Sequence, residues 1–141
     1  MKTELKTVII KLPGIKAISR NQTHGHWYKY QNCLREAEEW MATFGKRYEH
    51  HFTEPVNVWI DAYYDDRGRK RAADTPNIDD KIFTDILVRW KQRSKSKSIE
   101  RPVWFIEDDS PKYLNLVIKH SIPSDHYEVV IKIGEAFDQI L

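Results

Sequence analysis

Apolar and polar residues alternate along several short stretches of the chain, which is the pattern of β-strands with one buried face. Residues 7–13 (TVIIKLP) are β-branched and apolar and end at a Pro-Gly pair, and residues 55–64 (PVNVWIDAYY) alternate regularly. Residues 113–121 and 126–134 have a similar character and are separated by PSD, a turn-forming sequence. The pattern therefore predicts four strands, and we expect the last two to pair as an antiparallel hairpin.

Two other stretches follow a helical period, with apolar residues at spacings of three and four. The first runs from Tyr30 to about Tyr48, with apolar positions at Leu34, Ala37, Trp40, Met41 and Phe44. The second runs from Asn77 to Trp90, and its apolar face would contain Ile78, Ile82, Phe83, Ile86, Leu87 and Trp90. Strands that alternate with helices and then follow one another predict an α+β fold, a mixed sheet with two main helices packed on it.

The remaining segments are predicted to be connections. Residues 14–30 show little periodicity, and the Ser/Lys-rich residues 92–101 have the composition of a mobile loop. Residues 102–109 are predicted to form a short strand or a turn, and residues 135–141 a short helix. No segment repeats another.

Length and composition limit the class of protein. A chain of 141 residues with 40% hydrophobic residues predicts one globular domain, residues 1–141. No segment has the roughly 20 consecutive apolar residues of a membrane helix, and the first residues do not resemble a secretory signal. We therefore expect an intracellular, cytoplasmic protein without a membrane partner. Cys33 is the only cysteine, which excludes intramolecular disulfides and thiolate zinc clusters and predicts a small buried thiol.

The net charge is only +2, but the basic residues are concentrated in two runs. The first run supplies Arg67, Arg69, Lys70 and Arg71, and the second, residues 89–101, contains Lys91 and Arg93 among six bases and one acid. A polyanion would experience a local positive potential at each run. These residues are therefore candidate DNA contacts, with solvated loops as the alternative.

An acid-rich segment lies between the two basic runs. Either Asp74 or Thr75 could cap a helix whose first residue is proline. Capping does not explain Asp79, which helical spacing places in the middle of the apolar face. Burial of a carboxylate costs several kcal/mol unless it is paired or bound to a cation, and exposure by fraying of the first turn is the alternative. Asp79, with Asp80 and Lys81 beside it, is therefore a candidate site.

A second pair of acids, Asp108 and Asp109, ends an apolar run just before a Ser-Pro turn. Each acidic group alone is also compatible with an ordinary turn or helix end. Together they suggest a cation site, because Mg²⁺ binds a few carboxylate oxygens together with water and substrate phosphate.

The order of these motifs resembles the RusA family of Holliday junction resolvases, small phage-derived endonucleases. That pattern has a strand ending in Leu-Pro, a helix, an Asp-x-Asp-Asn…Lys motif followed by Asp-Ala-Leu, and an Asp-Asp pair after an apolar run. The matching stretches cover nearly the whole chain and are KLP at 11–13, the helix around YQNCLREAEEW, DTPNIDDKIFTDIL at 74–87 and FIEDDSPKY at 105–113. The basic run RGRKR before the first aspartate also fits.

The resemblance implies roles for individual residues. Asp74 matches the first family aspartate, Lys81 the lysine and Asp109 the later catalytic aspartate, with its neighbour Asp108 in reserve. The second aspartate falls on proline in one register and on asparagine in the other, so Asp79 or Asp80 would supply that carboxylate. Asp74, Asp79 and Asp109 would then bind Mg²⁺, with Mn²⁺ as an alternative, and Lys81 would stabilise charge on the scissile phosphate.

The function implied is Mg²⁺-dependent cleavage of branched DNA, the four-way junction of recombination and repair. A homodimer is implied as well, because two strands of a junction must be cut symmetrically. Two alternatives remain open from the residues: a nucleic-acid-binding domain of the same fold with impaired catalysis, and an interaction domain that does not bind nucleic acid.

Overall fold

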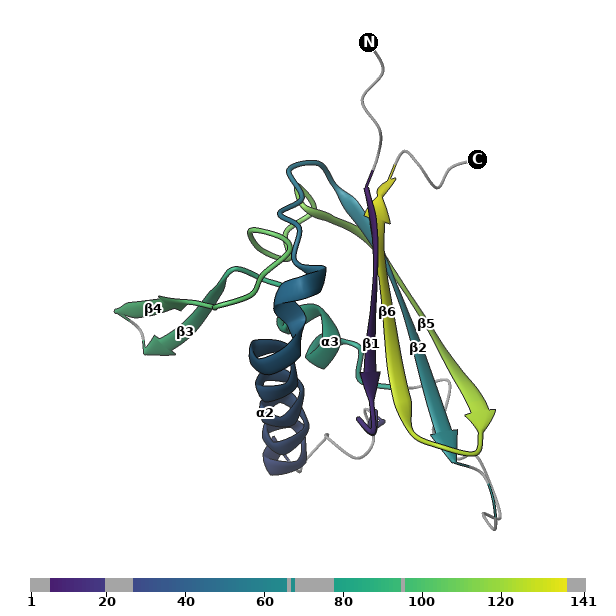
Figure 1. Ribbon diagram of the computed structural model, residues 1–141. Coiled ribbons are helices and arrows are strands. Elements are labelled where there is room, and N and C mark those ends of the chain that lie inside the picture. Colours follow the sequence, from purple (N-terminus) through teal and green to yellow (C-terminus); the bar gives the residue numbers. More distant parts are fainter. Residues whose placement is uncertain (1–5, 20–26, 66, 68–77, 95, 137–141) are drawn as a thin grey trace.

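The computed structural model describes residues 6–19, 27–65, 67, 78–94 and 96–136. They form a four-stranded mixed sheet, a separate two-stranded sheet and two α-helices, which confirms the α+β class (Figure 1). The elements are β1 (Thr7–Pro13), α2 (Trp27–Phe44), a 3₁₀ turn η1 (Gly45–Tyr48), β2 (Val56–Asp65), α3 (Lys81–Asp85), β3 (Trp90–Ser94), β4 (Lys97–Glu100), β5 (Leu114–Ser124) and β6 (Glu128–Glu135).

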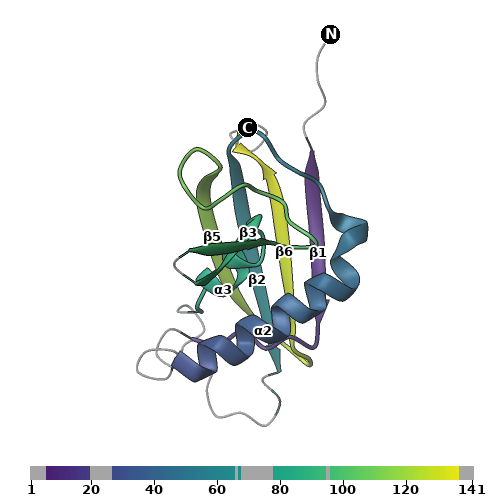
Figure 2. The same cartoon turned by 90° about the vertical axis from the view of Figure 1, so that its left-hand side faces the viewer.

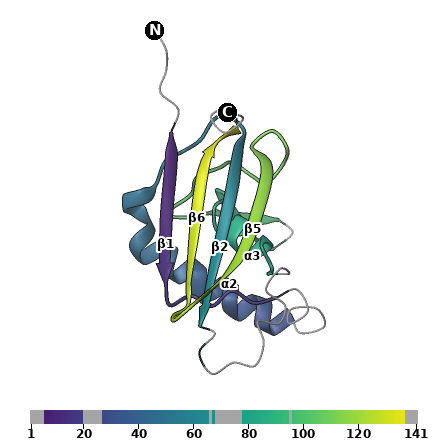
Figure 3. The same ribbon diagram turned by 90° about the vertical axis from the view of Figure 1, so that its right-hand side faces the viewer.

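The main sheet has the order β1-β6-β2-β5, in which β5 runs parallel to β2 and the other neighbours are antiparallel. The expected hairpin of the last two strands is therefore wrong. β2 lies between them, and Tyr63 of β2 is opposite both Ile122 of β5 and Glu128 of β6. Figure 3 shows β5 at the edge of the sheet. In agreement with these places, the residues of the central strand β2 are buried or half-buried throughout, whereas those of β5 are exposed or half-exposed.

One face of the sheet carries the core, and α2 and α3 pack on that face (Figures 1 and 2). Alternate residues of three strands point into it and are buried, namely Val8, Ile10, Leu12, Val58, Ile60, Val129, Ile131 and Ile133. Complete burial of such side chains contributes about 1.5–3 kcal/mol each. Among the described residues no helix covers the opposite face, which Figure 3 shows in front of the helices.

Helix α2 follows the predicted amphipathic pattern. It buries Cys33, Leu34, Ala37 and Met41 toward the sheet, and it begins at Trp27, three residues before the expected start. Burial is the main reason that the pKa of the Cys33 thiol is raised to about 12. The prediction of a small buried thiol is thus confirmed. No helix in the described part of the chain is long and apolar enough to cross a membrane.

The second predicted helix is much shorter than expected. Only Lys81–Asp85 is α-helical, while Ile78 and Val88 on either side form isolated β-bridges. The backbone explains the difference, because Asp79 N–H donates to Ile18 O (2.8 Å) and thereby bonds to a neighbouring segment instead of a helical turn. The apolar face is nevertheless buried at Ile78, Ile82, Phe83, Ile86 and Leu87.

Trp90 is the exception on that face, since it is 45% exposed and begins β3. The prediction of a loop over residues 92–101 is also wrong. β3 and β4 pair as an antiparallel hairpin that projects away from the sheet beyond the helices (Figure 1). Its Ser/Lys-rich composition reflects exposure of both faces of the hairpin and not a lack of structure. The proposed caps at Asp74 and Thr75, and residues 137–141 of the expected C-terminal helix, lie outside the described residues.

Replacing Phe83 by alanine is expected to lower the free energy of unfolding by about 3–5 kcal/mol, because the ring is fully buried and its loss leaves a cavity. Chemical denaturation followed by circular dichroism measures the change. Phe44→Ala removes the same ring from an exposed position of α2, where the side chain is 53% exposed, and should cost about 1 kcal/mol or less. Equal losses in the two variants would contradict the location of the core.

Candidate functional site

The start of α3 and the loop that contains Asp109 meet at Lys81. Its ammonium Nζ lies 3.6 Å from Asp85 Oδ1 and 3.9 Å from Asp109 Oδ2. Lys81 and Asp85 are one helical turn apart, whereas Asp109 comes from a distant part of the sequence. The side chains of Lys81 and Asp109 are 60% and 54% exposed, so this group faces solvent. The structure therefore brings together two of the residues that the sequence singled out, Lys81 and Asp109.

Asp85 is a member of this group that the sequence analysis did not select. Tyr30 of α2 donates a hydrogen bond to Asp85 Oδ2 (2.7 Å), which leaves Oδ1 toward Lys81. Burial, followed by the contact with Asp85, raises the pKa of Tyr30 above its usual range, so the phenol remains a donor. The guanidinium of Arg101 also donates to the Asp85 backbone carbonyl. The sequence held two signals for Asp85, its four-residue spacing from Lys81 and its place in DIL at 85–87, which matches the family's Asp-Ala-Leu.

Asp79 is buried, with 7% of its surface exposed, as its place on the apolar face predicted. The alternative of exposure by fraying is wrong. Its Oδ1 accepts a hydrogen bond from the backbone N–H of Lys81 (3.2 Å). A carboxylate at the start of α3 thus satisfies a backbone donor that the first turn leaves unpaired.

Asp80 interacts with a different part of the sheet. Lys119 of β5 places its Nζ 3.2 Å from Asp80 Oδ1, and the same ammonium donates to the Ile78 carbonyl (3.0 Å). Asp80 therefore forms an ion pair with a lysine of the edge strand β5, and the Asp80 side chain is 19% exposed.

Beside Lys81 lies an open cleft of about 420 Å³. It is lined mainly by acids, and the lining residues are Asp85, Val88, Trp90, Glu107, Asp108 and Asp109. Asp108 accepts the backbone N–H of Ser110 (2.7 Å), and hydrogen bonds from Ser110 hold its pKa below the usual value. Within the described ranges no three His, Cys, Asp or Glu side chains are grouped so as to hold a metal ion. Asp74 lies outside those ranges.

The candidate DNA contacts lie in separate places. Arg67 follows the end of β2 and forms an ion pair with Asp65 (3.0 Å), whereas the β3–β4 hairpin carries Lys91 and Arg93 (Figure 1). Lys91 also contacts Glu38 of α2 at 2.9 Å. The other three candidates, Arg69, Lys70 and Arg71, lie outside the described residues.

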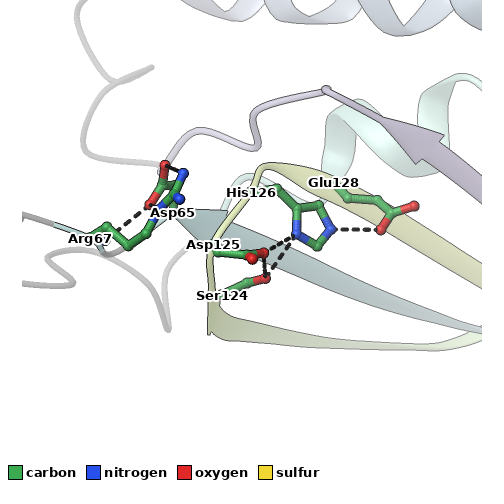
Figure 4. Close-up of polar contacts among 6 residues, drawn as sticks. All are labelled: Asp65, Arg67, Ser124, Asp125, His126 and Glu128. Carbon is green, nitrogen blue, oxygen red and sulfur yellow. Dashed lines mark hydrogen bonds and ion pairs between the residues drawn. The ribbon is translucent and has the colours of Figure 1, made fainter.

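A second polar cluster, which the sequence analysis missed, lies at the turn between β5 and β6 (Figure 4). His126 has Asp125 Oδ1 2.8 Å from Nδ1 and Glu128 Oε1 3.1 Å from Nε2. The hydrogen bonds with these two carboxylates raise the pKa of His126, and the same contact lowers the pKa of Asp125. The Asp-His-x-Glu spacing was the available signal in the sequence. Figure 4 also shows the Asp65–Arg67 pair beside this turn.

Comparison with known proteins does not assign a family. No protein-family model matches the sequence, and no curated protein matches it. The resemblance to the RusA family therefore stays a prediction, and the case for a function depends on the residues and geometry described above.

His126 is expected to titrate above its ordinary pKa of 6.5, because both ring nitrogens face carboxylates. Its pKa is raised in the folded state, so its contribution to stability is present below pH 6.5 and is lost as the pH rises through the folded-state pKa. An NMR titration of the imidazole measures this value. Asp125→Asn should lower it, whereas Glu39→Gln, at an exposed position of α2, should leave it unchanged. An unshifted His126 in the unmodified protein would refute the contact.

Proposed function

We propose that this chain is a Mg²⁺-dependent, structure-selective DNA endonuclease of the RusA type that hydrolyses phosphodiester bonds in four-way junctions. The observation that carries the proposal is the meeting of Lys81 and Asp109 in one solvent-facing group. The resemblance gives both residues a catalytic role, and they approach within 3.9 Å although they come from distant parts of the chain. An ammonium beside a carboxylate is a useful arrangement for phosphoryl chemistry, because it offers both a cation ligand and a positive charge for the phosphate.

The donor set suits the proposed cation. Mg²⁺ prefers carboxylate oxygens and keeps several waters, so it needs only one or two protein carboxylates together with substrate phosphate. The ligands would be Asp109, Asp74 and either Asp79 or Asp80. When bound, the cation would lower the pKa of a coordinated water and neutralise phosphate charge.

The side chains that contact Lys81 would determine the position of its ammonium group. Asp85 shares the ammonium with Asp109, and Tyr30 fixes Asp85 by its hydrogen bond at 2.7 Å. When a phosphate approaches, the ammonium can turn from these carboxylates toward the phosphate oxygens without leaving the site, since it is 60% exposed. A homodimer completes the proposal, because a two-fold axis would place two such sites on the two strands of a junction.

A second candidate function is a nucleic-acid-binding domain of the same fold with impaired catalysis. Two contacts favour it. Asp80 is paired with Lys119, and Asp79 accepts a backbone N–H, so both carboxylates that could replace the family's second aspartate already have local partners. Such a domain would bind DNA in a salt-sensitive manner and would not cut it with any divalent cation.

Replacing Asp109 by asparagine is expected to reduce cleavage of a labelled synthetic four-way junction by at least about 100-fold, the scale on which one electrostatic catalytic group acts. Junction binding should be unchanged or tighter, because one negative charge is removed near the phosphate. The assay compares reactions with and without Mg²⁺, and binding is measured by gel shift.

Asp61→Asn is the matched control, because Asp61 lies on β2 and contacts His120 at 3.4 Å. It should cleave normally. Cleavage that persists in the Asp109 variant would refute the site. Binding without cleavage by the unmodified protein would favour the impaired domain, and absence of binding at physiological salt would favour an interaction domain without a nucleic-acid role.

Replacing Arg93 by glutamine is expected to weaken junction binding and to reduce the slope of log K against log salt by about 0.9, the value for one lost phosphate contact on duplex DNA. Arg93 is exposed on the projecting hairpin. Lys11→Gln removes the same charge from an exposed position of β1, outside the hairpin, and should leave the slope unchanged. Equal slopes in all three proteins would remove the hairpin from the DNA interface.

A further inference from the structure

A row of flat side chains leads along the surface to the acidic cleft. The rings of His51 and Trp104 stack with centroids 3.5 Å apart and planes at 9°. The guanidinium carbon of Arg89 lies 5.0 Å from the ring centroid of Trp104 and 5.0 Å from that of Trp90. The row therefore connects His51, which follows η1, to Trp90 at the start of β3.

Arg89 is fixed in this row by two carboxylates. Its Nε contacts Glu100 Oε1 at 2.7 Å and its Nη1 contacts Glu107 Oε1 at 2.9 Å. Because the guanidinium is held on two sides, the tryptophan ring next to it has a firm support on one face. The ring of Trp90 is thus supported by a fixed cation, while 45% of the residue remains exposed.

The cleft that Trp90 lines offers the hydrogen-bond acceptors that a nucleobase edge needs. Four carboxylates line it, and ionised carboxylates only accept hydrogen bonds. Without a bound cation a phosphate inside it would be repelled, whereas the edges of nucleobases carry amino and imino groups that donate hydrogen bonds to Asp and Glu. The volume of about 420 Å³ lies within the range of about 300–1,000 Å³ found for ligand pockets.

The surroundings of the cleft supply the complementary charge for a nucleic-acid backbone. The hairpin that begins with Trp90 continues with Lys91 and Arg93, both exposed. A strand whose phosphates follow the hairpin could turn one base toward the cleft, where the exposed ring and the carboxylates lie. The phosphates of the strand would then contact the basic hairpin, and the base would contact the ring of Trp90 and the carboxylates.

We propose that Trp90 is the stacking platform for an unpaired nucleobase of a bound strand, and that the carboxylates of the cleft accept hydrogen bonds from the amino edge of that base. This inference rests on the nucleic-acid function proposed above and adds a preference to it. Asp109 lines the same cleft and contacts Lys81, so a captured base would hold its strand beside the proposed catalytic group. The preferred DNA would therefore contain unpaired nucleotides at the branch.

The experiment uses the full chain and a single-stranded oligonucleotide that contains 2-aminopurine, whose fluorescence falls when it stacks on an aromatic ring. The unmodified protein should quench the probe. Trp90→Leu should remove the quenching and weaken binding about tenfold, which corresponds to the stacking of one base. Trp90→Phe should restore part of both, because it keeps an aromatic face. Circular dichroism of each variant verifies folding.

Trp59→Leu is the matched control. Trp59 is half-buried on β2, where it lies opposite Lys132 and Ile118, and it points away from the core face that carries the helices. It should bind and quench as the unmodified protein does. Equal quenching by the Trp90→Leu variant would overturn the proposal. A protein that binds an arginine-rich peptide in the absence of DNA and leaves the 2-aminopurine probe unquenched would also overturn it.

Junction cleavage measured in parallel separates this inference from the proposed function. If the unmodified protein cuts junctions and Trp90→Leu neither loses quenching nor weakens binding, the stacking site is refuted while the nuclease stands. If the probe stacks on Trp90 and no junction is cut with Mg²⁺ or Mn²⁺, the nuclease is refuted while the stacking site stands.

Discussion

Burial of the segment around α3 is the constraint on which the candidate site depends. Ile82 and Phe83 are fully buried against the sheet, so the remaining faces of this short helix must point elsewhere. Lys81 and Asp85, one turn apart, are thereby directed toward the loop that carries Asp109. The same burial forces Asp79 inside, where a backbone N–H compensates its desolvation. Packing, and not attraction between the charged groups, therefore sets the geometry of the site.

The sequence predicted which side chains are buried better than it predicted which backbone hydrogen bonds form. Periodicity identified α2 and the buried face of residues 78–87 correctly, because both depend on local spacing. It extended the second helix too far, since the N–H of Asp79 finds a partner at Ile18, some sixty residues earlier. It also paired β5 with β6, although β2 lies between them. Pairings of this kind are decided by contacts between distant segments, which local pattern does not contain.

The residues of the candidate site also differ in how far the sequence could predict them. Lys81, Asp79 and Asp109 were identifiable from motif order and helical position. Asp85 lies in the same motif stretch, but its hydrogen bond from Tyr30 spans 55 residues and could not be predicted from local spacing. The exposed ring of Trp90 could not be predicted, because helical spacing placed that residue on the buried face. It is exposed because the chain leaves the helix after Asp85 and enters the hairpin.

The distribution of charge connects these features. The total charge of +2 describes neither the cleft, with its four carboxylates, nor the basic hairpin beside it. Arg89 lies at the boundary, where its two ion pairs join Glu107 of the cleft to Glu100 of the hairpin. A phosphate can approach the carboxylates only if a cation offsets their repulsion, whereas a base edge that donates hydrogen bonds needs no such cation. The same carboxylates would therefore bind the cation near Asp109 and accept hydrogen bonds from the base at Trp90. They would contact the phosphate of a nucleotide through the cation and its base directly.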